Sequence, residues 1–151
     1  MNNSCRIDLH EVGEEEKNNM IKVLNMHTIA VVGISKKSDR ASNYVARYLQ
    51  EKGYNIIPVR PGVKEIMGKR CYRDLEDIEE KVEVVNVFRR SEFCAKIAEK
   101  AVKIGAKALW MQEGIVSKEA QAIAQNAGLI VIMDYCLEKA YAKYIENNQH
   151  I

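Results

Sequence analysis

The sequence predicts a three-layer α/β sandwich in one domain, with a mostly parallel five-stranded sheet. Five short apolar runs rich in Val and Ile alternate with segments of helical periodicity, a pattern typical of parallel strands that are buried on both faces. Glycines follow several of the helical segments, as expected where a helix ends. The 151 residues, 47% of them hydrophobic, suffice for one core of this kind. We therefore expect a Rossmann-like fold.

The elements follow in chain order. The apolar runs predict strands at residues 28–34, 54–59, 82–88, 106–111 and 129–133. The periodic segments predict helices at residues 14–26, 42–52, 91–104, 117–127 and 137–145, with one or two helical turns at 74–78. Residues 66–72 are expected to form a connector. The stripe formed by Leu137, Ala140, Tyr141 and Tyr144 fits packing on the sheet or on a second subunit.

Composition excludes several classes of function. A net charge of +2, from 23 basic and 21 acidic residues, gives no case for a nucleic-acid partner. No apolar run approaches the roughly 20 residues that span a membrane, and residues 1–16 are too polar for a secretory signal, so we expect a cytoplasmic protein. Four scattered cysteines without a C-x-x-C pair predict reduced thiols and no metal site.

Candidate binding residues follow the predicted strands at their carboxyl ends, where ligands of open α/β sheets bind near the reversal of strand order. Hydrogen-bond donors dominate these loops. They include Ser35, Lys36, Lys37 and Arg40 after the first strand, Arg60 after the second, and Arg89 and Arg90 after the third. Such a set suits a ligand with several phosphates, and the first loop alone could hold a pyrophosphate on backbone N–H groups and the Ser35 hydroxyl.

Two features argue against an NAD site. The first loop carries Gly33 alone, where the dinucleotide fingerprint G-x-G-x-x-G has three glycines. The second strand ends in Val59-Arg60-Pro61, where an NAD site needs an acid for the ribose 2′-hydroxyl. Arg60 instead suits a phosphate on the ribose, either the 2′-phosphate of NADP or the 3′-phosphate of coenzyme A (CoA). The alternative is that Arg60 is a solvated surface residue that contacts no ligand.

The residues resemble a known family. Five short motifs occur in order between residues 28 and 136: Val32-Gly33-Ile34-Ser35, Pro58-Val59-Arg60-Pro61, Phe88-Arg89-Arg90, Trp110-Met111-Gln112-Glu113-Gly114 and Asp134-Tyr135-Cys136. Together they are similar to those of the small CoA-binding domain proteins, which are related to the CoA-binding domain of the succinyl-CoA synthetase α subunit. Arg60 replaces the Asn of the family's P-V-N-P turn, and Glu113 places a carboxylate beside Gln112.

The resemblance implies that residues 28–136 form a CoA-binding domain, preceded by a tail and lead-in helix (1–27) and followed by a helix and tail (137–151). The first loop would surround the pyrophosphate, and the segments after strands two and three would lie near the adenosine. Gln112 is expected to be more exposed than Trp110, which ends a buried strand. The implied binding residues are Gly33, Ile34, Ser35, Lys36, Arg40, Arg60, Pro61, Phe88, Arg89, Arg90 and Gln112.

The same comparison argues against ligase chemistry. The synthetase works through a phosphohistidine, but His10, His27 and His150 all lie outside the matched segment. We expect a protein that binds CoA or acyl-CoA, alone, as a homodimer or beside an acyl-CoA enzyme, with no catalytic residue assigned. The alternatives are an NADP-binding oxidoreductase or sensor, and a thiol-dependent enzyme that acts on CoA thioesters through Cys136. The sequence leaves the roles of Cys136 and Asp134 open.

Overall fold

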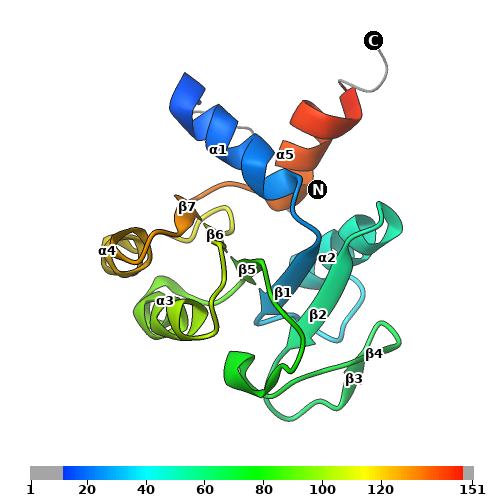
Figure 1. Ribbon diagram of the computed structural model, residues 1–151. Helices are drawn as coiled ribbons and strands as arrows, with labels where there is room; N and C mark the ends of the chain where they lie inside the picture. Colours follow the sequence, from blue (N-terminus) through cyan, green and yellow to red (C-terminus); the bar gives the residue numbers. More distant parts are fainter. Residues whose placement is uncertain (1–11, 148–151) are drawn as a thin grey trace.

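Five parallel strands form the central sheet of the computed structural model, which describes residues 12–147 (Figure 1). The strands are β1 (Thr28–Val32), β2 (Asn55–Val59), β5 (Val84–Val87), β6 (Ala108–Met111) and β7 (Ile130–Ile132). Their order across the sheet is β2-β1-β5-β6-β7, with Val32 opposite Val59 on one side and Val87 on the other. The chain thus leaves β1 toward one edge and returns to build the other, so strand order reverses between β1 and β5.

Helices cover both faces of this sheet (Figure 1). Helices α1 (Glu14–Leu24), α2 (Ala41–Glu51) and α5 (Leu137–Tyr141) cover one face, and α3 (Cys94–Lys103) and α4 (Lys118–Asn126) cover the other. Met20, Val45 and Leu137 belong to the core on the first face, and Ile97 and Ala120 to the core on the second. The predicted three-layer α/β fold with a five-stranded sheet is confirmed, and all five strands are parallel.

Local sequence signals account for the helix ends. The Ser117 side chain accepts a hydrogen bond from the Ala120 N–H at 3.1 Å, which satisfies one of the free donors at the start of α4. Helices α3 and α4 end near Gly105 and Gly128, which have φ values of +78° and +90°. The final helix differs from prediction, because after Tyr141 it continues as a π-helical turn at Ala142–Glu146.

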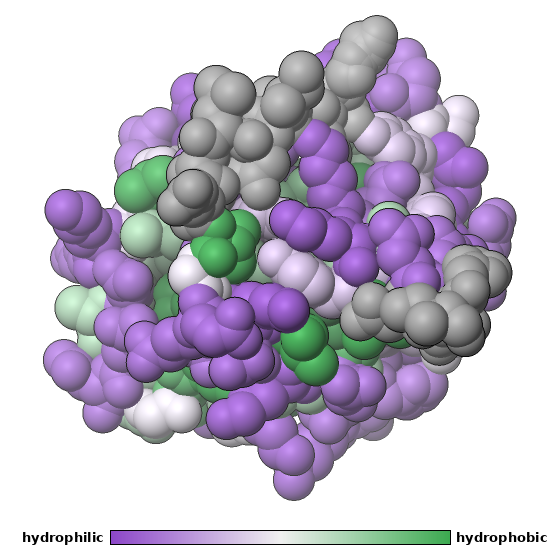
Figure 2. Space-filling model, turned by 90° about the horizontal axis from the view of Figure 1, so that it is seen from above, coloured by the Kyte–Doolittle hydropathy of each residue, from purple (hydrophilic) through white to green (hydrophobic). Residues whose placement is uncertain are grey.

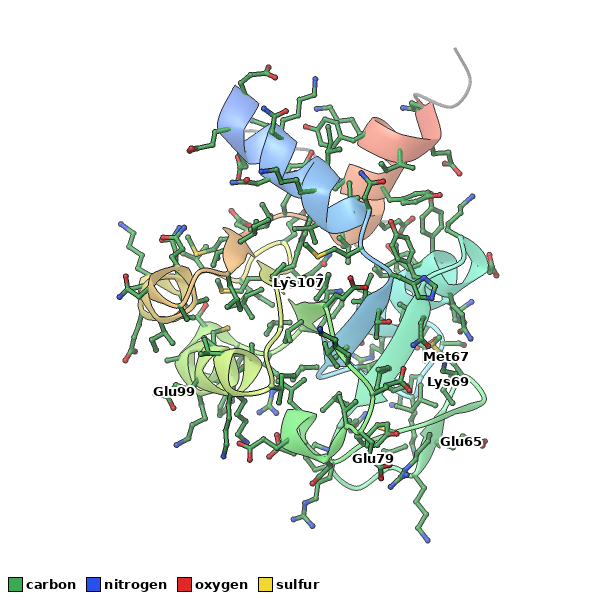
Figure 3. All side chains as sticks on the ribbon, viewed as in Figure 1. Glu65, Met67, Lys69, Glu79, Glu99 and Lys107 are labelled. Atoms are coloured by element: carbon green, nitrogen blue, oxygen red, sulfur yellow. The ribbon has the colours of Figure 1, made fainter. Side chains whose placement is uncertain are left out.

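A short hairpin occupies the segment expected to be a connector. It pairs β3 (Glu65–Ile66) with β4 (Lys69–Arg70), and Figure 3 shows Glu65, Met67 and Lys69 on it, beside β2. Its turn residues Met67 and Gly68 have φ values of +59° and +72°, as a two-residue hairpin turn requires. The hairpin leads the chain back to Tyr72, which forms a bridge with Val59 at the end of β2.

The last helical segment packs on its own molecule. Leu137, Ala140, Tyr141 and Tyr144 are all buried in the core formed with α1 and α2. Figure 2 shows a mostly hydrophilic surface on the face seen from above. Within residues 12–147, no helix is long and apolar enough to span a membrane. The parts of the predicted terminal tails that fall at residues 1–11 and 148–151 lie outside the described residues.

Candidate functional site

A cavity of about 760 Å³ opens at the carboxyl ends of β1, β2 and β5, where strand order reverses. We call it the loop cavity. The segment between β1 and α2, together with the first two residues of α2, supplies seven of its eleven lining residues, and the residues that follow β2 and β5 supply the other four. Its lining residues are Gly33, Ser35, Lys36, Lys37, Arg40, Ala41, Ser42, Arg60, Pro61, Phe88 and Arg89. Its location is the one expected for the ligand site of such a sheet.

The loop cavity is strongly cationic. Lys36, Lys37, Arg40, Arg60 and Arg89 line it, and the described lining contains no carboxylate. None of the five forms an ion pair with a carboxylate of residues 12–147. Five positive charges without internal compensation create a potential that attracts anions.

Side chains of α2 hold the loop in place. The Ser35 N–H donates to Ser42 Oγ at 2.8 Å, and the Asn43 side-chain amide donates to the Ser35 carbonyl at 2.8 Å. Arg47 in turn donates from Nε to Asn43 Oδ1 and from Nη2 to the Ser38 carbonyl, both at 2.8 Å. The loop therefore has a fixed shape before any ligand arrives, which lowers the entropy cost of binding.

The Ser35 hydroxyl group can donate a hydrogen bond to a ligand. Its oxygen accepts the Lys37 N–H at 3.1 Å, so the hydroxyl proton is available to an acceptor in the cavity. The first turn of α2, which begins at Ala41 and Ser42 in the cavity wall, contains no acidic residue. Backbone N–H groups at the start of a helix lack intrahelical acceptors and favour anions.

Gly33 directly follows β1 and lies against the end of β2 and the residues that follow β5. Its φ of +87° is one that side-chain-bearing residues rarely adopt, and its N–H donates to the Val59 carbonyl at 3.0 Å. A Cβ atom at this position would lie 2.8 Å from Arg89 Cδ and 3.0 Å from the Phe88 carbonyl oxygen. The missing side chain thus makes room for the stem of Arg89.

Eight of the eleven residues expected to bind ligand line the loop cavity, and Ile34, Arg90 and Gln112 do not. Ile34 is buried in the core, and Arg90 is exposed beside Glu92, with 3.3 Å between Nε and Oε1. Gln112 is slightly more exposed than Trp110, as expected, but it is still buried at 6% exposure, and its Oε1 accepts the Leu137 N–H at 3.5 Å. Contact of these three residues with a ligand stays a prediction.

The loops after β6 and β7 are tied to each other. Asp134, with φ +61°, accepts the Gly114 N–H on Oδ1 at 2.6 Å. Lys139 Nζ lies 3.9 Å from Glu113 Oε1, so the carboxylate beside Gln112 has a cation next to it. The fully buried Trp110 donates its indole N–H to the Tyr135 carbonyl at 2.7 Å. These residues therefore have structural partners of their own.

The buried thiols offer no accessible nucleophile. Cys136 is 1% exposed in the core beside Trp110 and Leu137. Burial raises the pKa of the Cys71 thiol above its ordinary value, and the thiol donates a hydrogen bond to the Arg60 carbonyl at 3.6 Å. Burial likewise raises the pKa of the Cys94 thiol. A raised pKa keeps a thiol protonated and unreactive at neutral pH.

Sequence reasoning missed Ala41 and Ser42, and it included Lys37 only as part of the cationic set. The signal available was the position of Ala41 and Ser42 at the start of a helix that follows a phosphate-type loop. It also missed a second cavity of about 370 Å³, which shares Gly33, Pro61 and Arg89 with the loop cavity. We call this one the Phe93 cavity. Its contact with the loop cavity could not be inferred from the order of residues.

Similar proteins identify the family. Residues 27–142 match the CoA-binding domain family. The protein YneT of Bacillus subtilis is 36% identical over 142 residues, which cover 94% of this chain and 98% of that protein. A solved structure of a hypothetical protein from Pyrococcus horikoshii is 33% identical, with a TM-score of 0.81 over 95% of this chain and 98% of the other.

A longer protein contains a similar segment. The ADP-forming acetate–CoA ligase of Methanocaldococcus jannaschii is 25% identical over 80 residues, which cover 53% of this chain and 11% of the ligase. The match to the CoA-binding domain family, over residues 27–142, includes every strand of the central sheet and the whole lining of the loop cavity. By sequence, fold and topology, this chain belongs to the CoA-binding domain family.

Proposed function

We propose that the protein binds CoA or an acyl-CoA in the loop cavity, without ligase chemistry of its own. The observation that carries the proposal is the set of five cations, without a carboxylate, at the point where strand order reverses. CoA carries a pyrophosphate and a 3′-phosphate, and a site of this charge suits both groups. Membership of the CoA-binding domain family supports the same ligand class.

The pyrophosphate would lie against the loop between β1 and α2. The Ser35 hydroxyl and the first N–H groups of α2 are donors at this wall, and the Asn43 and Ser42 contacts hold the loop in shape. Lys36 and Arg40 are exposed at the same wall and supply positive charge. Such donors form charge-assisted hydrogen bonds with phosphate oxygens.

Arg60 would contact the 3′-phosphate. Its backbone is fixed on both sides, because its N–H donates to the Tyr72 carbonyl at 2.7 Å and its carbonyl accepts from Cys71 Sγ at 3.6 Å. Its half-buried side chain lines the loop cavity and has no carboxylate partner within residues 12–147. A guanidinium held in this way is suited to bidentate recognition of a phosphate.

His27, the histidine within residues 12–147, is not positioned for phosphohistidine chemistry at the loop cavity. His27 directly precedes β1, and its backbone N–H donates to Glu83 Oε1 at 2.8 Å. It therefore lies at the amino end of the strand, whereas the loop cavity lies at the carboxyl end. Cys136 is buried in the core, which gives no support to a thiol-dependent reaction.

Calorimetry with four ligands tests the proposal. CoA should bind more tightly than 3′-dephospho-CoA, and both should bind more tightly than NAD. Tighter binding of NADP than of CoA would favour the alternative of an NADP oxidoreductase or sensor, for which Arg60 could hold the 2′-phosphate. Absence of CoA binding at millimolar concentration would contradict the proposal.

Arg60→Ala sharpens the test. The variant should lose about 1–3 kcal/mol of binding free energy with CoA, as expected for hydrogen bonds to a charged group, and almost none with 3′-dephospho-CoA. Arg70→Ala is the matched control, because exposed Arg70 lines neither cavity. Equal losses for the two ligands would remove Arg60 from the 3′-phosphate site while leaving CoA binding intact.

A further inference from the structure

The Phe93 cavity differs in chemistry from the loop cavity. Four buried side chains, Val32, Val59, Leu75 and Ile97, contribute to its wall together with the ring of Phe93. Its charged residues are of both signs, and one pair is already joined, since Lys100 Nζ lies 2.7 Å from Asp74 Oδ2. A cavity with an aromatic ring and an apolar wall suits a flat, uncharged group.

Arg89 is shared by the two cavities. Its stem passes over Gly33, and its guanidinium carbon lies 4.2 Å from the centroid of the Phe93 ring. Arg90 is farther from the same centroid, at 5.5 Å, and is exposed. The close cation–π partner of Phe93 is therefore Arg89, which covers an aromatic surface that a flat ligand group could also use.

A phosphate would give Arg89 a stronger partner. The Phe93 ring offers the Arg89 N–H groups no oxygen acceptor, and within residues 12–147 no carboxylate accepts them. Charge-assisted hydrogen bonds to phosphate are stronger than hydrogen bonds between neutral groups. An anion in the loop cavity therefore favours conformers in which Arg89 has left the ring.

We infer that the Phe93 cavity binds the aromatic base of a nucleotide whose phosphates occupy the loop cavity, and that the base replaces Arg89 on Phe93. The inference rests on the proposed function and adds a stacking residue and an order of preference to it. The two ends of the ligand are coupled, because the phosphate draws away the guanidinium that covers the stacking surface. A nucleoside without phosphate must displace Arg89 unaided.

The exchange predicts opposite effects of one substitution on two ligands. Arg89→Ala should bind CoA about tenfold more weakly, because a phosphate contact is lost. The same variant should bind adenosine more tightly than the wild type does, by about threefold or more, because the ring is uncovered. A purely structural role for Arg89 would weaken both ligands. Arg70→Ala removes the same charge at an exposed position that lines neither cavity and should change neither affinity.

Substitutions of Phe93, with Arg89 unchanged, test the stacking surface itself. Phe93→Leu should weaken both adenosine and CoA by about fivefold or more through lost stacking, and should leave the affinity for inorganic pyrophosphate within twofold. Phe93→Tyr keeps the ring and should retain the wild-type affinities. Circular dichroism and urea unfolding of each variant show whether the fold is intact.

The outcomes separate this inference from the proposed function. Failure of CoA and inorganic pyrophosphate to bind the wild-type protein would contradict the proposed function. If both bind, two results overturn the exchange alone. The first is that adenosine binds Arg89→Ala no more tightly than it binds the wild type, and this result includes the case in which neither protein binds adenosine detectably. The other is unchanged CoA affinity in folded Phe93→Leu.

Discussion

Gly33 and Arg89 fit together at the ends of β1 and β5: a Cβ atom on Gly33 would lie 2.8 Å from Arg89 Cδ. This distance is too short for a carbon–carbon contact, and the Phe88 carbonyl oxygen would lie only 3.0 Å from the same atom. Gly33 thus permits both the turn after β1 and the route of the Arg89 stem between the two cavities.

Gly33→Ala should destabilise the protein by about 2–4 kcal/mol, since the backbone conformation and the crowding both disfavour a side chain. Urea unfolding measures the loss. Gly105→Ala is the matched control, because Gly105 has a similar φ of +78° but no atom within 4 Å of the position that a Cβ would take. The two variants would share the conformational cost, so an equal loss in both would contradict the role of Gly33 in accommodating Arg89.

Asn43→Ala should weaken CoA binding and lower the stability by about 1–2 kcal/mol, because the Ser35 carbonyl and the Arg47 guanidinium each lose a hydrogen-bond partner. Calorimetry and urea unfolding measure the two effects. Asn126→Ala, at the exposed end of α4, is the control and should leave CoA affinity unchanged. Wild-type affinity in Asn43→Ala would show that the loop keeps its shape without this contact.

Glu83 should make the stability depend on acidic pH. The backbone N–H groups of His27 and Thr28 donate to Glu83 Oε1 at 2.8 and 3.0 Å and lower the pKa of its carboxyl below the ordinary 4.5. A lowered pKa stabilises the fold above pH 4.5, and this contribution disappears as pH falls through the lowered value. At pH 7 the free energy of unfolding of the wild type should exceed that of Glu83→Gln by about 1–2 kcal/mol, and this difference should shrink below pH 4.5.

Urea unfolding at several pH values measures this trend. Glu99→Gln, on the exposed part of α3 (Figure 3), is the matched control and should stay within about 0.5 kcal/mol of the wild type. A difference between wild type and Glu83→Gln that does not change between pH 7 and pH 3 would contradict the hydrogen-bond explanation.

Asn86 should be more costly to the fold than an apolar residue. It is fully buried in β5, opposite Val31 and Trp110, and neither polar atom of its amide has a hydrogen-bond partner within residues 12–147. Asn86→Val removes this buried polar group and should raise the free energy of unfolding by about 1–2 kcal/mol. Urea unfolding measures the change, and a less stable Asn86→Val protein would show that the amide makes a favourable contribution.

The sequence predicted the sheet well because its strands are buried on both faces. Runs such as residues 28–34 and 82–88 identify parallel strands directly, and their β1 and β5 cores are entirely buried. The hairpin at residues 65–70 escaped prediction because two-residue strands carry no periodicity, and Met67 is an unusual residue at φ +59°. Local patterns therefore predicted the large elements and missed the smallest.

The site was predictable as a position but not as a set of contacts. Arg60 and Arg89 directly follow predicted strands. Ligand sites of such sheets lie at the carboxyl ends of the strands, and the two residues do line the same cavity there. The bond from Asn43 to Ser35 and the stack of Arg89 on Phe93 depend on side-chain geometry that no spacing reveals. Gln112 follows a predicted strand as well, but the start of α5 covers it.

A crystal structure of the protein with CoA tests the central claim most directly. We predict that the pyrophosphate lies against the loop between β1 and α2, within hydrogen-bond distance of the Ser35 hydroxyl and of the first N–H groups of α2. A pyrophosphate bound instead at the loops after β6 and β7, beside Gln112 and Gly114, would contradict the account.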